Sequence, residues 1–100
     1  MKRAEINKRD REFSAKVRSR GKCERCGRRP PQVQLQCAHI FSRRYMRLRW
    51  MDDNAFCLCA GDHMWAHHNP VLFGMFAQDK LGPDRFQALI DERNNLEKAQ

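Results

Sequence analysis

The sequence predicts a small α+β domain in which two short strands pair beside several helices. The chain has only 100 residues, which limits it to one domain with a small core. Two segments in its middle have the composition of strands, and the segments on either side repeat apolar residues at helical spacing. We therefore expect one domain over residues 9–100, with its central unit at about residues 22–68. A flexible basic arm is expected over residues 1–8.

The first half of the chain is expected to form a helix and then a strand. Residues 8–20 have helical spacing, which places Phe13 and Val17 on one face. Two adjacent prolines further along predict a loop, because proline cannot donate a backbone hydrogen bond. Residues 33–40 alternate with a period of two and predict a strand that reaches His39 near its end.

The second half of the chain is expected to be mostly helical. Residues 55–59 predict a short second strand, and Asp62 is a possible N-cap for the helix that follows. Pro70 and Gly82 interrupt the helical pattern and divide it into three helices, over residues 62–68, 70–81 and 84–98. The last helix has a stripe of apolar residues expected to be buried, formed by Phe86, Leu89, Ile90 and Leu96.

Charge is distributed unevenly along the chain. The net charge is +8, but residues 1–50 contain 16 basic and 4 acidic residues, whereas residues 51–100 contain 4 and 8. Fourteen of the 20 basic residues are arginine, whose planar guanidinium suits phosphate. A basic half joined to an acidic half indicates a polyanionic partner that is approached from one side.

The composition also excludes several classes of protein. No apolar run approaches the roughly 20 residues needed to span a bilayer, and the N-terminal residues lack the apolar centre of a secretory signal. We therefore expect no membrane partner and a cytoplasmic location. In that reducing compartment the five cysteines are metal ligands or buried thiols rather than disulfides.

Thiols and imidazoles are concentrated in the middle of the chain. Cys23 and Cys26 form a two-cysteine knuckle, and Cys59 precedes the predicted helix from residue 62. His63 and His67 are four residues apart, so that one face of this helix carries both rings and could share a cation. Because a core of this size often needs a metal to be stable, the pattern predicts a structural zinc ion.

These residues resemble the HNH endonucleases, a family whose ββα-metal hairpin and helix carry a histidine, an asparagine and a histidine in that order. Here His39 and Asn54 are 15 residues apart, Asn54 and His63 nine, and His63 and His67 four. The resemblance covers roughly residues 10–80, and residues 38–45 favour the phage-borne branch. The matching stretches are Cys23-Glu24-Arg25-Cys26, Cys37-Ala38-His39-Ile40, Asn54-Ala55-Phe56-Cys57-Leu58-Cys59 and His63-Met64-Trp65-Ala66-His67.

The resemblance assigns a role to each matching residue. His39 matches the general base that removes a proton from the attacking water, and Asn54 matches the residue that fixes the loop beside that base. His63 and His67 match the positions that hold the catalytic divalent cation, with His63 counted in the catalytic set. The implied activity is hydrolysis of DNA phosphodiester bonds, by nicking or double-strand cleavage, that leaves a 5′ phosphate and a 3′ hydroxyl.

Two positions depart from the family pattern. Ala38 stands where many members have a metal-ligating residue, so the cation would have two protein ligands; Mg²⁺, Mn²⁺, Ni²⁺, Co²⁺ and Zn²⁺ all stay open. Asp62 stands where the family has the fourth cysteine of its structural zinc site. Zinc accepts carboxylate oxygen, so the favoured ligands are Cys23, Cys26, Cys59 and Asp62. Cys57 and Cys37 are the alternatives to the aspartate.

A group of arginines follows the predicted base. Together they are expected to contact DNA phosphates and position a duplex over the cation: Arg43, Arg44, Arg47 and Arg49. The resemblance to the phage branch suggests a role in phage DNA processing or packaging, with terminase or portal proteins as possible partners. The alternatives are a zinc-stapled DNA-binding module with weak or no catalysis, indicated by Ala38, and a subunit that is active only within a packaging complex.

Overall fold

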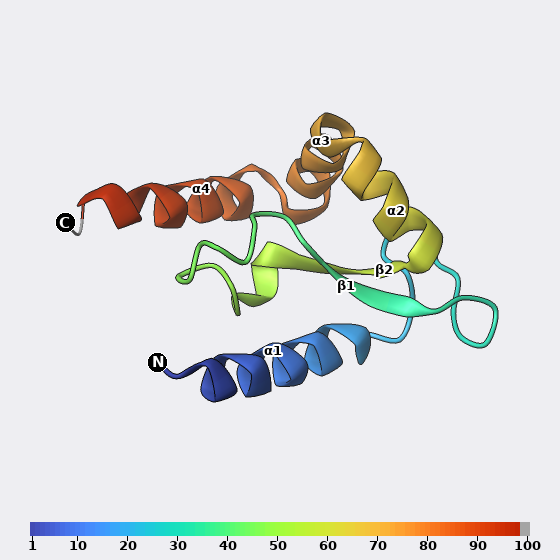
Figure 1. Ribbon diagram of the computed structural model, residues 1–100. Coiled ribbons are helices and arrows are strands. Elements are labelled where there is room, and N and C mark those ends of the chain that lie inside the picture. The colour runs from blue at the N-terminus through green and yellow to red at the C-terminus, as the bar shows by residue number, and fades with distance from the viewer. Residues whose placement is uncertain (99–100) are drawn as a thin grey trace.

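A two-stranded antiparallel sheet lies at the centre of the fold, with helices on both of its sides (Figure 1). Strand β1 (Leu35–His39) pairs with strand β2 (Ala55–Cys59), so that Leu35 lies opposite Cys59 and His39 opposite Ala55. The computed structural model describes the backbone of residues 1–98 and the side chains of residues 1–95. The predicted α+β class is confirmed, and the predicted bounds of the second strand are those observed.

Helix α1 (Arg3–Arg18) covers one face of the sheet. Phe13 and Val17 are buried against Ala55 and Cys57 of β2, as their helical spacing predicted. The helix begins five residues earlier than predicted and takes in most of the segment expected to be a flexible arm. The reason is local: residues 3–8 contain no proline or glycine, and the Ile6 N–H donates to the Lys2 carbonyl at 3.1 Å to close the first turn.

Helices α2 (Ala60–His68) and α3 (Pro70–Leu81) cover the other face. Here Ala38, Phe56 and Leu58 of the sheet pack in one core cluster with Ala66, Phe73 and Ala77. Strand β2 is therefore buried on both faces, which explains its continuous apolar sequence. Helix α2 begins two residues before the predicted start, because the Cys59 thiol rather than Asp62 caps it and accepts from the Asp62 N–H.

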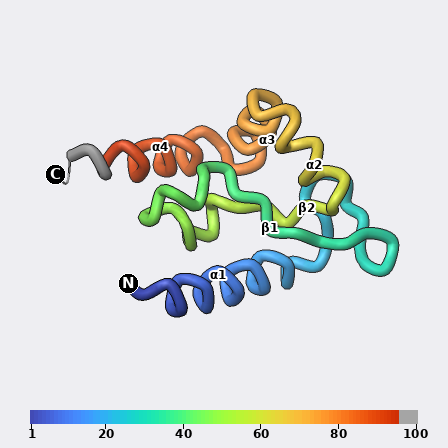
Figure 2. The backbone as a smooth tube through the Cα atoms, viewed as in Figure 1, coloured from blue at the N-terminus to red at the C-terminus, as the bar shows by residue number. Residues whose placement is uncertain are grey.

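The remaining elements close one end of the hairpin. A short 3-10 helix, η1 (Asp52–Asn54), leads into β2 and packs against α4 (Pro83–Lys98). Leu89 of α4 is buried as predicted, whereas the side chain of Leu96 lies outside the described residues. Figure 2 shows the segment between α1 and β1 extending past the end of the hairpin where β2 meets α2. Within the described residues, no helix has both the length and the apolar composition needed to cross a bilayer.

Candidate functional site

A cavity of about 580 Å³ lies along β1, between α1 on one side and α2 with α3 on the other. His39 lines it from the end of β1, and His63 and His67 line it from α2. Asp10 and Ser14 contribute from α1. The fold thus brings to one cavity three imidazoles that are up to 28 residues apart in the sequence.

The two α2 imidazoles are arranged as a pair of ligands would be. Nε2 of His63 lies 3.2 Å from Nε2 of His67. Two nitrogens that bind one ion at ordinary zinc–nitrogen distances are about 3.0–3.4 Å apart. Nδ1 of His63 lies 2.7 Å from Oε1 of Gln36, and that oxygen can only accept, so Nδ1 carries the proton and Nε2 keeps its lone pair. The pair can therefore hold a cation at the cavity.

Burial favours the neutral form of His63. It lowers the pKa of this imidazole below its ordinary value of 6.5, and positive charge on His67 or His39 would lower it further. Gln36, which fixes the tautomer of His63, was not among the residues predicted from the sequence. Its one signal is a polar side chain in a strand, on the same face as the buried Ala38.

The ring of His39 is held by the backbone of the loop that follows it. Its Nε2 lies 2.9 Å from the carbonyl oxygen of Arg49. A carbonyl can only accept, so Nε2 carries the proton of the neutral ring and the lone pair is on Nδ1. Phe13 packs against the ring with centroids 5.6 Å apart. Burial lowers the pKa of His39 and outweighs the hydrogen bond to Arg49, which raises it, so the ring is neutral at pH 7.

Asn54 is fully buried and anchors the loop between the strands. Its Oδ1 accepts from the Phe41 N–H at 2.9 Å, and its Nδ2 donates to the carbonyls of Phe41 at 3.1 Å and Leu48 at 3.0 Å. One side chain thus joins the beginning of the loop to its end. The resemblance predicts that Asn54 fixes the loop beside a general base, His39.

Replacing Asn54 by alanine is expected to lower the free energy of unfolding by about 2–4 kcal/mol, because one buried N–H and two carbonyls lose their partner. Urea unfolding with zinc in excess would measure this change. Asn7→Ala on the exposed side of α1 is the matched control and should alter stability by less than about 0.5 kcal/mol. A loss at Asn54 no larger than the loss at Asn7 would contradict the anchoring role.

A second group of ligand atoms lies at the other end of β2. Atoms of Cys23, Cys26, Cys59 and Asp62 that could bind a metal all lie within 4.8 Å of one another. Sγ of Cys26 and Sγ of Cys59 are 3.9 Å apart, close to the roughly 3.8 Å edge of a tetrahedral zinc–thiolate site. Three thiols and one carboxylate are a donor set that zinc accepts. The four residues therefore form a candidate structural metal site.

The hydrogen bonds around these four residues favour a role as metal ligands. The Cys26 N–H points to the Cys23 sulfur and the Asp62 N–H to the Cys59 sulfur, each at 3.4 Å. Arg25 donates to Oδ1 of Asp62 at 2.7 Å and lies over the Trp65 ring at 3.6 Å. Burial alone would raise the pKa of Asp62, but the hydrogen bonds from the thiols and Arg25 outweigh it and lower the pKa. The carboxylate is therefore ionised, as a ligand must be.

The geometry also separates the cluster from the two alternative cysteines. Cys57 belongs to the core cluster under α1, and Cys37 lies directly opposite it on β1. Cys59 instead packs with Cys23 in the cluster beneath α2. Regular alternation along a strand would place Cys57 and Cys59 on one face, but Cys59 is both the last strand residue and the helix cap, where the chain turns. Burial raises the pKa of Cys37 to about 11, in keeping with an inert thiol.

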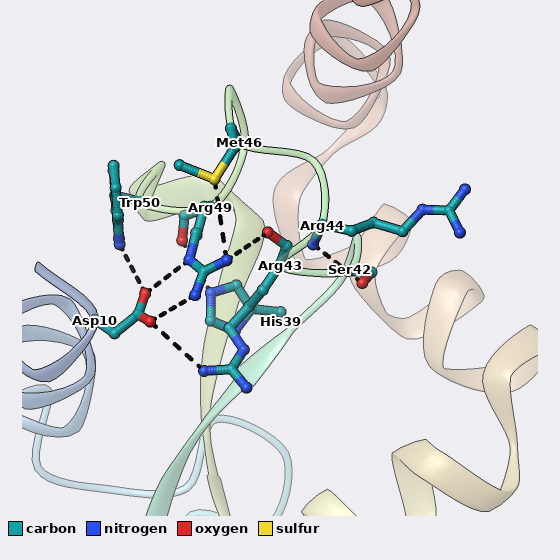
Figure 3. A network of polar contacts seen from close by, with 8 residues as sticks. All are labelled: Asp10, His39, Ser42, Arg43, Arg44, Met46, Arg49 and Trp50. Carbon is teal, nitrogen blue, oxygen red and sulfur yellow. Dashed lines mark hydrogen bonds and ion pairs between the residues drawn. The ribbon is translucent and has the colours of Figure 1, made fainter. Parts of the chain in front are cut away.

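The four arginines of the loop differ in their surroundings, and Figure 3 shows Arg43, Arg44 and Arg49. Arg49 donates to Asp10 from both Nε and Nη2, at 2.9 and 2.6 Å, and its side chain is only 15% exposed. Arg47 pairs with Glu92 at 2.7 Å. Arg43 lines the cavity with a side chain that is 61% exposed, and Arg44 is also exposed. Arg43 and Arg44 are therefore the loop arginines most accessible to a polyanion.

No protein-family model, curated protein or solved structure matches this chain. The resemblance and the geometry of two sites in the structure therefore bear on its function. One is a cavity with three imidazoles and an exposed arginine at its margin. The other is a thiol–carboxylate cluster at the start of the helix that carries two of those imidazoles.

Proposed function

We propose that the protein is a metal-dependent DNA endonuclease of the HNH type, in which β1, β2 and α2 form the ββα-metal unit. The observation that carries the proposal is that His39, His63 and His67 line one cavity, with the Nε2 atoms of the α2 pair 3.2 Å apart. The resemblance to the phage-borne branch places the activity in phage DNA processing or packaging, in the cytoplasm of a bacterial host.

The proposed chemistry uses the three imidazoles of the cavity. Nδ1 of His39 takes a proton from a water molecule whose oxygen bonds to the phosphorus. The bond from phosphorus to the 3′ oxygen breaks, solvent supplies the proton of the new 3′ hydroxyl, and the phosphate stays on the 5′ side. His63 and His67 would hold the divalent cation, which when bound would neutralise charge developing on the phosphate and the 3′ oxygen. Asn54 holds the loop after His39 at Phe41 and at Leu48.

The second site would hold a structural zinc ion. Cys59 and Asp62 flank the first turn of α2, and His63 follows directly. Cys23 and Cys26 come from the knuckle after α1, so one ion would link that segment to the end of β2 and the start of α2. Zinc bound there would fix the direction from which His63 and His67 reach the cavity.

DNA is the substrate that the charge distribution favours. Arg43 lies at the cavity with an exposed guanidinium, and Arg44 is exposed beside it. The knuckle adds Arg28 and Arg29, both exposed. Guanidinium groups at these positions would bind phosphates of the backbone without reading base edges, so little sequence preference is expected from this domain.

Relaxation of a supercoiled plasmid tests the proposal. The wild-type protein with added Mn²⁺, Ni²⁺ or Mg²⁺ is expected to nick the plasmid, and His67→Ala to reduce the rate by at least about 100-fold because one of two protein ligands is lost. His68→Ala is the matched control, since His68 is the exposed neighbour and does not line the cavity. Equal rates in the two variants, or no nicking by the wild type with any cation, would refute the proposal.

One observation favours a second candidate, a zinc-stapled DNA-binding module or packaging subunit without catalysis of its own. Ala38, where many family members supply a metal ligand, is buried and offers no donor atom. The plasmid experiment separates the two if a binding assay is run beside it. Salt-sensitive DNA binding without nicking would support the module, and nicking only after addition of terminase or portal proteins would support the subunit.

A further inference from the structure

Asp10 lies on the side of α1 that faces the loop after β1, where its carboxylate is enclosed by donors (Figure 3). Oδ1 accepts from Nε of Arg49 and from Nε1 of Trp50, both at 2.9 Å, and Oδ2 accepts from Nη2 of Arg49 at 2.6 Å. A guanidinium nitrogen of Arg43 is 3.7 Å from Oδ2. The Asp10 side chain is 19% exposed, so this two-point ion pair is mostly shielded from water.

Arg49 connects this ion pair to the rest of the loop and to the ring of His39. Its Nη1 donates to the carbonyl of Arg43 at 3.0 Å, which joins the start of the loop to its end. Its own backbone carbonyl receives the Nε2 proton of His39 at 2.9 Å. The side chain and the backbone of one residue therefore connect α1, the loop and the ring of His39.

The side chain of Asn54 does not hold the part of the loop formed by Arg49 and Trp50. Its side-chain contacts are with Phe41 and Leu48, and the carbonyl that holds His39 belongs to the residue after Leu48. Rotation of the peptide between Arg49 and Trp50 would withdraw that carbonyl without breaking any contact of Asn54. The two-point bond to Asp10, with the Trp50 indole on the same carboxylate, holds the residues on both sides of this peptide.

We infer that Asp10 is a positioning residue for His39: by clamping Arg49 and Trp50 it fixes the carbonyl that selects the Nε2–H tautomer and directs Nδ1. The inference rests on the proposed function only for its catalytic consequence. The hydrogen bond from Arg49 lowers the pKa of Asp10 to about 2, so the clamp is charged throughout the range in which a nuclease would work. Both carboxylate oxygens are engaged in the clamp, which assigns Asp10 a holding role and not that of a metal ligand.

Asp10→Asn tests the clamp with a side chain of the same shape. An amide has one acceptor oxygen, and its NH₂ group would face the donors of Arg49 or Trp50. We expect the ¹⁵N chemical shifts of the neutral His39 ring, recorded without DNA, to change from one Nε2–H tautomer to a mixture of tautomers. We also expect kcat for plasmid nicking to fall about 10-fold or more with KM for DNA changed less than twofold.

Glu92→Gln is the matched control, because it breaks an ion pair to Arg47 in the same loop at a distance from His39. It should leave the tautomer and kcat as in the wild type. If Asp10→Asn does not fold, Trp50→Phe removes one donor from the same carboxylate and should give a smaller tautomer shift in the same direction. The inference would be overturned if folded Asp10→Asn has the wild-type ¹⁵N spectrum of the His39 ring. If Asp10→Asn does not fold, the same result in Trp50→Phe would overturn it. Absence of nicking by the wild type would refute the proposed function alone, since the spectrum needs no catalysis.

Discussion

Removal of the proposed structural zinc ion is expected to unfold the domain. Structural zinc contributes about 10–16 kcal/mol to the folding of small zinc-dependent units at neutral pH, which is comparable to the roughly 5–15 kcal/mol net stability of a typical domain. Here the four ligands come from the knuckle, the end of β2 and the first turn of α2. Without zinc, three thiols and a carboxylate are left together in a partly buried cluster. A strong chelator should abolish the cooperative thermal transition followed by circular dichroism, and excess zinc should restore it.

Two cysteine variants test whether loss of zinc from the cluster of Cys23, Cys26, Cys59 and Asp62 causes the unfolding. Cys59→Ala is expected to lower the zinc content from one ion per chain to well below one and to give the chelated spectrum. Cys57→Ala, two residues away in the same strand, removes a buried thiol outside the cluster and should keep one zinc with a loss of about 1 kcal/mol. Loss of zinc in Cys57→Ala, or an unchanged melting curve after chelation, would overturn the assignment.

Much of the fold was predictable because its signals are local. Pro70 and Gly82 bound α3 where the sequence predicted, and the short apolar run gave β2 its observed bounds. The start of α1 was not predicted, since a basic sequence was interpreted as an arm although nothing in it prevents a helix. The start of α2 was placed two residues late because a thiol at Cys59 supplies the cap that was assigned to Asp62.

The site residues were likewise predictable only where their signal in the sequence is local. Those given by spacing, such as His63 and His67 one helical turn apart, are found together in the cavity. Gln36 and Asp10 were missed because their partners are 27 and 39 residues away, and sequence separation says nothing about such contacts. Asp10 did leave one signal: an acidic side chain three residues before Phe13, close to the buried face of a basic helix.

The different roles of the loop arginines also depend on contacts with residues far away in the sequence. Four arginines in the loop after β1 suggested a uniform phosphate-binding surface, but a sequence cannot distinguish an arginine that is paired from one that is exposed. Arg49 is held by Asp10 and Arg47 by Glu92, whereas Arg43 has an exposed side chain at the cavity. Part of the positive charge of the first half therefore stabilises the loop, and the exposed remainder is accessible to the polyanion that the proposed function requires.

Replacing His39 by alanine is expected to reduce the nicking rate by about 10²–10⁴-fold, the usual contribution of a general base. Zinc content, cation binding by the α2 pair and affinity for DNA should be unchanged, because the ring contacts none of those ligands in the described structure. Only the neutral ring can accept a proton, and burial lowers the pKa of His39 below 6.5. The wild-type rate should therefore rise with pH through a midpoint below 6.5 and be constant at neutral pH.

The pH profile distinguishes a base from a residue that only supports the fold. The rates are compared at saturating cation, so that protonation of His63 does not limit them. If His39 accepts the proton, the residual rate of His39→Ala no longer falls at acid pH as the wild-type rate does, whereas His68→Ala keeps both this fall and the wild-type rate. A purely structural role would lower the rate at every pH by one factor and leave the midpoint in place. Metal-dependent nicking by His39→Ala at the wild-type rate would exclude this imidazole as the base, and the lone pair on Nδ1 would then have no part in catalysis.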